Sequence, residues 1–258
     1  MILNLPTDIA RHYKSGSQQA RVITEPWAQE NMYCPACRSP KLTKTETNRK
    51  VVDFLCPQCD SAFQLKASRR RFAHKVVDAA YEVMKRAILD DRLPHLLLLY
   101  YSFGDGMVVD LLLIPRFALG LSALEARRPL PPTARRAGWV GCNILLDSVP
   151  PDARIFLVQD GEIVPPASVR AQFHAAQRLD EISVVKRGWT LDVLTALRTL
   201  ERQRFTLAEA YAFENVLARK HPENRNIRPK IRQQLQVLRD LGYIEFLGPG
   251  FYKWRSDG

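Results

Sequence analysis

The sequence predicts an α/β domain over residues 1–182 followed by a smaller α+β domain over residues 183–258. Three observations lead to this prediction. Strand-length apolar runs alternate with helical segments in the first part, and two Cys-Pro-x-Cys knuckles lie near its start. After about residue 188, three helical segments precede a short hairpin. At 258 residues the chain is long enough to give each domain its own core.

The first domain is predicted to begin with a helix over residues 7–31. Ser17 is a candidate cap of this helix, and Pro26 marks either a kink or the first turn of a new helix. The knuckles and a hairpin follow over residues 33–66. The segment 69–89 has the apolar spacing of an amphipathic helix.

Short strands make up the rest of the first domain. HLLLLYYSF and GMVVDLLLIP flank a Gly-Asp-Gly turn at 104–106, and ARIFLVQ precedes an Asp-Gly turn. Residues 127–143 are basic and rich in proline, which indicates a surface loop. A helix over about 165–178 is expected to close the domain.

The second domain contains three predicted helices and a hairpin around Gly-Pro-Gly. Thr206 caps the second helix, with Glu209 at the capping-box position. The third helix is basic, and this order of elements is typical of a winged-helix DNA-binding domain. The helical segments are TLDVLTALRTLER, FTLAEAYAFENVLARK and NIRPKIRQQLQVLRDLG.

The net charge of +11 favours a polyanionic partner, although a solubilising surface is the alternative explanation. Residues 183–258 hold 14 Lys/Arg and 8 Asp/Glu, hence +6, and the segment 1–182 carries the remaining +5. No run of 18 apolar residues occurs, so no membrane span is expected. MILNLPTDIARHYK lacks the layout of a signal peptide, which favours a cytoplasmic protein.

Four of the five cysteines form two pairs, Cys34-x-x-Cys37 and Cys56-x-x-Cys59, with the segment 38–55 between them. This spacing is typical of a tetrahedral four-cysteine zinc site, in which no position is left open for a substrate. Disulfides are the alternative, but they do not suit a cytoplasmic protein. We therefore expect structural zinc, and we expect Cys142 to be a buried apolar residue.

The two arms of the hairpin carry an acid and a lysine. Asp53 lies on the first arm, and Gln64 and Lys66 share one face of the second, because side chains alternate along a strand. An acid opposite such a pair is how PD-(D/E)xK nucleases assemble a Mg²⁺ site. The spacing alone is also typical of a solvated cross-strand pair without chemistry.

The chain resembles the DpnI family of methyl-directed restriction endonucleases along almost its whole length. This resemblance implies an N-terminal PD-(D/E)xK domain with a four-cysteine zinc site, a C-terminal winged helix, and Mg²⁺-dependent cleavage of duplex DNA at GATC carrying N6-methyladenine. The segments that carry it are YKSGSQQARVITEPW, YCPAC, VVDFLCPQCDSAFQLK, PLPPTARRAGWVGCNI, RIFLVQDG, RGWT and KIRQQLQVLRDLGYIEF.

The resemblance also implies roles for individual residues. Asp53 matches the metal-binding acid and Lys66 the catalytic lysine, while Leu65 matches the residue whose main-chain carbonyl binds Mg²⁺. Gln64 departs from the pattern, which has Asp or Glu there, so weaker metal binding is expected. An active enzyme and a centre with reduced or lost cleavage are both compatible with this glutamine. Glu25 is a candidate for a compensating carboxylate on its position alone.

Candidate DNA contacts occur in both domains. In the first, Arg135 and Arg136 precede Trp139, which either packs on a methylated base or lies in the core. In the second, the start of the third helix carries residues that either read bases or contact only phosphates: Asn226, Arg228, Lys230, Arg232 and Gln233.

Three functions compete. The first is a monomeric Mg²⁺-dependent endonuclease specific for methylated GATC. The second is the same fold with a weakened or inactive centre that binds methylated GATC without cutting, an alternative raised by Gln64. The third is a transcription regulator built from a zinc ribbon and a winged helix, which gives Asp53 and Lys66 no role.

Overall fold

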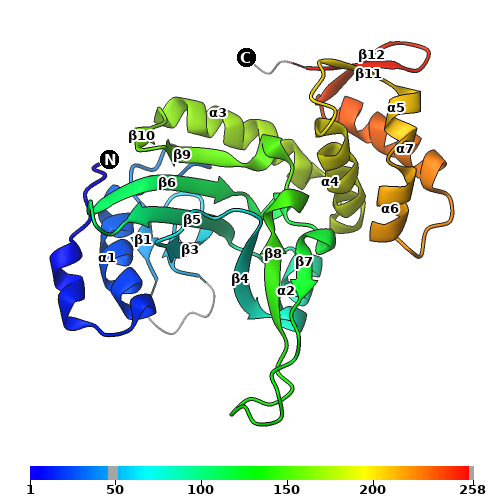
Figure 1. Ribbon diagram of the computed structural model, residues 1–258. Coiled ribbons are helices and arrows are strands. Elements are labelled where there is room, and N and C mark those ends of the chain that lie inside the picture. Colours follow the sequence, from blue (N-terminus) through cyan, green and yellow to red (C-terminus); the bar gives the residue numbers. More distant parts are fainter. Residues whose placement is uncertain (46–51, 256–258) are drawn as a thin grey trace. The chain divides into compact units, whose positions relative to one another are not determined.

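A computed structural model describes residues 1–45 and 52–255 (Figure 1). Residues 46–51 of the predicted hairpin segment lie outside the described residues. The described chain forms two compact units, one of residues 1–76, 91–116 and 152–176 and the other of residues 77–90, 117–151 and 177–258. None of the helices in the described part is both long enough and apolar enough to span a bilayer.

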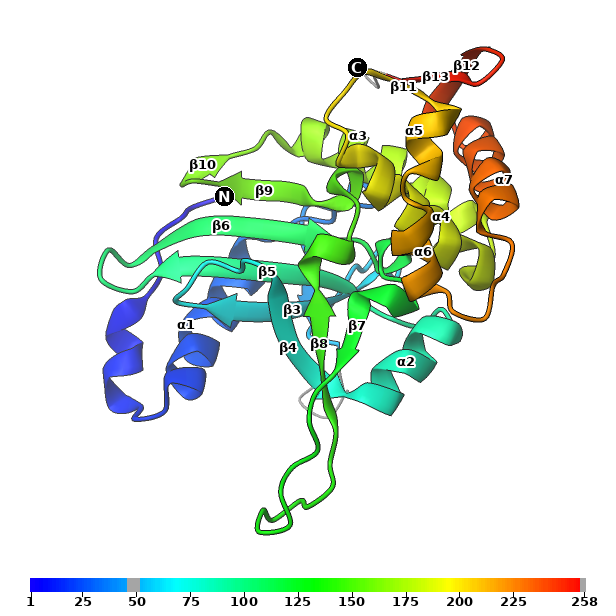
Figure 2. The same cartoon turned by 45° about the vertical axis from the view of Figure 1, so that its right-hand side comes forward.

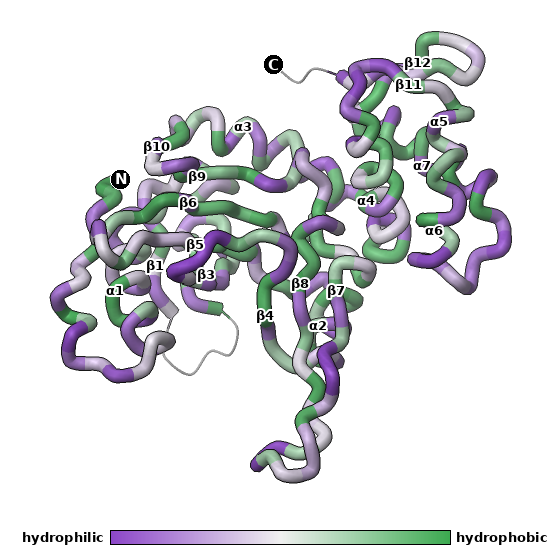
Figure 3. The backbone as a smooth tube through the Cα atoms, viewed as in Figure 1, coloured by the Kyte–Doolittle hydropathy of each residue, from purple (hydrophilic) through white to green (hydrophobic). Residues whose placement is uncertain are grey.

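The first unit is built on a seven-stranded sheet in the order β1-β2-β3-β5-β6-β9-β10. Neighbouring strands are antiparallel, except that β3 and β5 are parallel. Figure 3 shows β6 and β9 as largely hydrophobic, as expected for strands that have a neighbour on each side. The strands are β1 (Thr43–Lys44), β2 (Phe54–Leu55), β3 (Ala62–Ser68), β5 (His95–Ser102), β6 (Met107–Ile114), β9 (Ile155–Gln159) and β10 (Glu162–Ile163).

Helices α1 (Gly16–Asn31) and α3 (Pro166–Gln177) belong to this unit, together with the 3₁₀ helix η1 (Thr7–His12). Phe173 of α3 packs edge-on against His95, with ring centroids 5.2 Å apart, and His95 in turn contacts Phe63 at 5.1 Å. Burial lowers the pKa of His95 to about 3, with the charge of Arg116 adding to the effect, so this histidine is a neutral core residue.

The prediction of one helix over 7–31 is wrong in two details. Tyr13 and Ser15 have extended backbone, which separates η1 from α1. Ser15, not Ser17, is the residue that precedes α1, and neither serine caps the helix with its side chain. Pro26 lies inside α1 beyond the first turn. The predicted strands at 95–103, 106–115 and 153–159 and the helix at 165–178 are confirmed.

A second sheet has three strands in the order β4-β8-β7, and most of its residues belong to the second unit. It comprises β4 (Lys75–Ala80), β7 (Leu124–Ala126) and β8 (Gly141–Leu145), and α2 (Tyr81–Leu89) follows β4. The predicted helix over 69–89 is therefore wrong in its first half. Exposed and buried residues alternate from Lys75 to Asp78, and pairing within this sheet overrides the helical spacing.

The winged-helix arrangement follows, with the three-stranded sheet β11-β13-β12 and four helices. Figure 2 shows the helices and this sheet from a second side. The elements are α4 (Val184–Arg198), β11 (Arg204–Thr206), α5 (Leu207–Tyr211), α6 (Glu214–Lys220), α7 (Ile227–Asp240), β12 (Ile244–Gly248) and β13 (Phe251–Trp254). The remaining 3₁₀ helices are η2 (Arg116–Ala118), η3 (Leu121–Ala123), η4 (Leu146–Ser148), η5 (Pro151–Ala153) and η6 (Arg178–Glu181).

Two boundaries in this part differ from the prediction. The helical segments were expected to begin after about residue 188. Helix α4 instead starts at Val184 and runs through Gly188. The single helix expected over 205–220 is two helices, broken at Phe213, although no proline or glycine marks the break in the sequence. The capping box of Thr206 and Glu209 is confirmed.

Candidate functional site

The hairpin of β2 and β3 brings Asp53 beside the middle of β3. Phe54 pairs with Phe63, and the Asp53 amide donates a hydrogen bond of 2.9 Å to the Phe63 carbonyl. The Asp53 carboxylate in turn accepts a hydrogen bond of 2.8 Å from the Leu65 amide. One side-chain oxygen is thereby fixed against the backbone of Leu65, between Gln64 and Lys66.

Gln64 and Lys66 lie on one face of the sheet, because they alternate with Leu65 along β3. Across the parallel pairing they neighbour Leu96 and Leu98 of β5. The side chains of Gln64 and Lys66 are partly exposed. The structure thus places Asp53, Gln64, Leu65 and Lys66 in one cluster. Their chemical roles remain predictions.

Electrostatics link Asp53 to a second carboxylate. Burial raises the pKa of Asp53, and the negative charge of Glu25 raises it further, against the Leu65 hydrogen bond and the charge of Lys66. Glu25 extends from α1 and forms ion pairs of 2.7 Å with Arg21 and with Lys44. Position in the sequence suggested Glu25, and the structure now places its charge within range of Asp53.

This cluster offers the ligands that a hard cation prefers: carboxylate oxygens, an amide oxygen and backbone carbonyls. Asp53 is half-buried and feels the negative charge of Glu25, and a divalent ion beside the two carboxylates would relieve their repulsion. The donor set therefore fits Mg²⁺. Lys66 adds a cation whose charge acts on Asp53 from the same hairpin.

The four paired cysteines lie together at the tip of the hairpin. The Cys34 and Cys59 sulfurs are 3.7 Å apart, those of Cys37 and Cys56 are 3.5 Å apart, and all four lie within 4.8 Å of one another. A tetrahedral ion with bonds of about 2.3 Å holds its sulfur ligands about 3.8 Å apart. All five cysteines of the chain are free, so the disulfide alternative is wrong. The four cysteines are positioned to hold a metal ion.

Backbone donors support the sulfur atoms. The Ser39 amide donates to Cys37 Sγ at 3.3 Å, and the Gln58 amide donates to Cys56 Sγ at 3.4 Å. Burial works to raise the pKa of Cys56, but hydrogen bonds from the Gln58 and Cys59 amides and from neighbouring thiols lower it to about 7. A thiolate at this position is therefore accessible near neutral pH, as metal binding requires. Cys142 is fully buried outside the cluster, as predicted.

Sequence reasoning missed a support of this cluster. Arg170 of α3 donates from Nε to the Cys34 carbonyl at 3.2 Å and to the Cys37 carbonyl at 2.7 Å. Its guanidinium lies 4.9 Å from the centre of the Tyr33 ring. Arg170 is far from the knuckle in the sequence, and no local pattern connects the two.

The loop between β7 and β8 extends away from its sheet (Figure 2). Arg135 and Arg136 are exposed, and the Arg136 guanidinium lies 4.5 Å from the centre of the Trp139 ring. Trp139 is only partly buried and packs beside Gly141, where an added Cβ would lie 2.8 Å from the indole. The alternative that Trp139 is a core residue is wrong, and its contact with DNA stays a prediction.

Helix α7 turns its candidate DNA-contacting residues toward solvent. Lys230 Nζ donates to Gln233 Oε1 at 2.8 Å, and the Arg228 guanidinium is paired with Glu214 at 2.7 Å. The opposite side of the helix is buried through Ile231, Leu235 and Leu238. The residues that are exposed or partly exposed are Asn226, Arg228, Lys230, Arg232 and Gln233.

A buried aspartate behind α7 was not predicted. Asp192 of α4 accepts hydrogen bonds from Ser122 Oγ at 2.7 Å and Lys220 Nζ at 2.7 Å, and it contacts His221 Nε2 at 2.8 Å. His221 stacks on Trp189 with ring centroids 3.6 Å apart. Burial opposes ionisation of Asp192, but these partners hold its pKa below the usual value. The network fixes the end of α6, from which the chain leads into α7.

Comparison with protein-family models gives two matches. The model described as the Dam-replacing family, DpnI, matches residues 1–182, and the model of the Dam-replacing HTH domain matches residues 185–254. The first covers well over half of the chain, and the second covers the segment from α4 to β13. With its four-cysteine cluster and winged helix-turn-helix, this chain belongs to the DpnI, or Dam-replacing, family.

Proposed function

We propose that this protein is an endonuclease that cleaves duplex DNA at GATC sites carrying N6-methyladenine, by Mg²⁺-dependent hydrolysis in a PD-(D/E)xK centre. One observation carries the proposal. The Asp53 carboxylate is fixed on the Leu65 amide, with Gln64 and Lys66 on the two sides, in a chain of the DpnI family.

In the proposed mechanism, Asp53, Gln64 and the Leu65 carbonyl would hold Mg²⁺. The ion, when bound, polarises the scissile phosphate and makes the attacking water more acidic. Lys66 would orient this water and accept its proton at Nζ while the water oxygen bonds to phosphorus. The bond from phosphorus to the departing deoxyribose oxygen breaks, and that oxygen takes a proton from solvent. In this proposal Glu25, whose negative charge raises the pKa of Asp53, supplies the negative charge that Gln64 lacks.

The cysteine cluster has a separate part in the proposal. Cys34, Cys37, Cys56 and Cys59 hold one Zn²⁺, which has no open position for substrate and closes the hairpin on which Asp53 and Lys66 lie. Because β1 and β2 are only dipeptide strands, their pairing alone gives this edge of the sheet little stability.

Duplex DNA is held in this proposal by two surfaces, one in the segment that matches the DpnI family model and one in the helix-turn-helix segment. Arg135, Arg136 and Trp139 contact it from the β7–β8 loop. The exposed residues at the start of α7, namely Asn226, Arg228, Lys230, Arg232 and Gln233, contact it from the helix-turn-helix. The polar side chains there suit base edges, and the cations suit phosphates.

A second candidate, a binding module without cleavage, is favoured by Gln64 alone, because an uncharged oxygen binds Mg²⁺ more weakly than a carboxylate does. A zinc-ribbon transcription regulator would leave the Asp53–Leu65 contact and Lys66 without a role.

Digestion of plasmid DNA separates these functions. The protein should cut adenine-methylated plasmid in Mg²⁺ or Mn²⁺ and leave unmethylated plasmid intact. Equal cutting of both plasmids would contradict methyl specificity. Binding of methylated DNA without cutting in either metal would replace the nuclease with the binding module.

A further inference from the structure

Three consecutive arginines, Arg69, Arg70 and Arg71, follow directly after β3, the strand that carries Gln64 and Lys66. The site described above gives them no role. Their side chains differ sharply in what they contact, and this difference points to a function for the middle one.

Arg69 is tied to α1 and to the end of β5. It donates from Nη2 to Gln19 Oε1 at 2.5 Å and from Nε to the Tyr101 hydroxyl at 3.4 Å. Its guanidinium also lies 3.8 Å from the centre of the Phe103 ring. These contacts occupy the guanidinium with protein groups.

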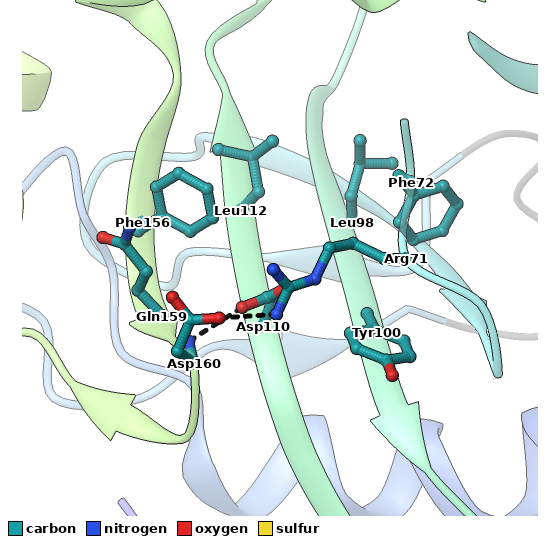
Figure 4. A pocket seen from close by; sticks show the side chains of 9 residues that line it. All are labelled: Arg71, Phe72, Leu98, Tyr100, Asp110, Leu112, Phe156, Gln159 and Asp160. Carbon is teal, nitrogen blue, oxygen red and sulfur yellow. Dashed lines mark hydrogen bonds and ion pairs between the residues drawn. The ribbon is translucent and has the colours of Figure 1, made fainter. Parts of the chain in front are cut away.

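Arg71 is bound instead to β6 and to the turn that follows β9. It forms ion pairs of 2.9 Å with Asp110 of β6 and 2.6 Å with Asp160, which follows β9 (Figure 4). Asp110 also accepts a hydrogen bond of 2.9 Å from the Asp160 amide. Two carboxylates thus contact one guanidinium, and their combined negative charge opposes the binding of an anionic ligand to Arg71.

The ion pairs of Arg71 lie on the sheet face that carries Lys66. They border a hollow of about 100 Å³ whose lining includes Leu98 and Leu112. Lys66 pairs with Leu98, and Leu98 pairs with Leu112, so these side chains share one face. The segment after β3 therefore passes over the face where the proposed cleavage takes place.

Arg70 is exposed, and its guanidinium makes no hydrogen bond or ion pair with any residue the structure describes. Its backbone is held, because its amide donates to Ser68 Oγ at 3.0 Å and both neighbours are anchored. Four residues at about 3.3 Å each place its Cα within about 13 Å of the Lys66 Cα. One strand of a duplex has a phosphate about every 3.4 Å along the helix axis, so this distance corresponds to at most about four phosphates.

We propose that Arg70 is a phosphate-binding residue, which holds a DNA backbone phosphate a few nucleotides from the bond cleaved beside Lys66. The inference rests on the proposed nuclease function, because that function brings DNA to this face. A guanidinium can bind two phosphate oxygens at once. Because the backbone of this segment is already held, little conformational freedom is lost on binding. Arg69 and Arg71 act as the anchors of the segment.

The test is a salt series on the full chain, with a duplex containing methylated GATC and with Ca²⁺ replacing Mg²⁺. Arg70→Ala should weaken binding about tenfold, as expected for a hydrogen bond to a charged group. It should also reduce the slope of log K against log [salt] by about 0.9, the value for one lost phosphate contact. Arg70→Lys should keep most of that slope but not the full affinity.

Arg11→Ala is the matched control, because it removes an exposed arginine from η1 whose ion pair, among the described residues, is a surface contact with Asp8. An equal loss of slope in this variant would overturn the assignment to Arg70, as would unchanged binding by Arg70→Ala. The melting temperature of Arg70→Ala should match that of the wild type. If the wild type binds with this arginine-dependent slope yet never cuts in Mg²⁺, the phosphate site stands and the nuclease function fails.

Discussion

Asp53→Asn and Lys66→Ala are each expected to abolish DNA cleavage while leaving binding of methylated duplex largely intact. Asparagine can still accept the 2.8 Å hydrogen bond from the Leu65 amide, so the hairpin should fold, but the negative charge that we propose holds Mg²⁺ is lost. Removal of a group that moves a proton in the reaction lowers the rate by about 10²–10⁴. Single-turnover cleavage and equilibrium binding measure the two effects separately.

Lys14→Ala is a suitable control, because Lys14 is an exposed lysine outside the cluster. Its cleavage rate should equal that of the wild type. If Asp53→Asn cleaved at the wild-type rate, this carboxylate would not belong to the reaction. If both variants lost binding and cleavage together, the cluster would be a DNA-binding surface and no catalytic centre.

The second large effect concerns the cysteine cluster. Purified protein should contain one zinc per chain, and Cys59→Ser should lose the metal, the hairpin and cleavage together. Apparent binding free energies of structural zinc reach about 10–16 kcal/mol in small domains, so its loss removes more stability than a hairpin of this size has. Metal analysis and thermal melting check both parts.

Cys142→Ala is the matched control, since Cys142 is a buried cysteine outside the cluster. It should keep the full zinc content and destabilise the protein only by the loss of a small buried group. Absence of stoichiometric zinc from the wild type would contradict the account of the cluster. So would a Cys59→Ser variant with wild-type metal content and melting temperature.

Local pattern was sufficient for much of the fold and of the site. The cysteine spacing, the capping box of Thr206 and the apolar runs of β5 and β6 depend on residues close in sequence. Each is specified by short-range chemistry: ligand spacing, hydrogen bonding across one turn, or side-chain alternation. Asp53 and Lys66 could be paired because one hairpin carries both.

Features that depend on distant partners were missed. The segment 75–80 has a helical pattern but pairs with β8, a strand that is remote from it in the sequence. Arg170 reaches the knuckle carbonyls from α3, and Asp192 is ionised in the interior because Lys220 and His221 meet it there. No local sequence pattern specifies such contacts, because the partners come together only when the chain is folded.

The central claim is that Gln64 contacts a catalytic Mg²⁺ ion, and the Mg²⁺ dependence of cleavage by Gln64→Glu tests it most directly. A carboxylate at this position restores the charge that a hard cation prefers, so the half-saturating Mg²⁺ concentration should fall, by roughly tenfold or more. A Gln64→Glu variant that cuts more slowly but still shifts the Mg²⁺ curve would mean that the site is built around glutamine. Superimposable Mg²⁺ curves for wild type and variant would contradict the claim, because a metal ligand cannot gain a charge without changing the affinity for its ion.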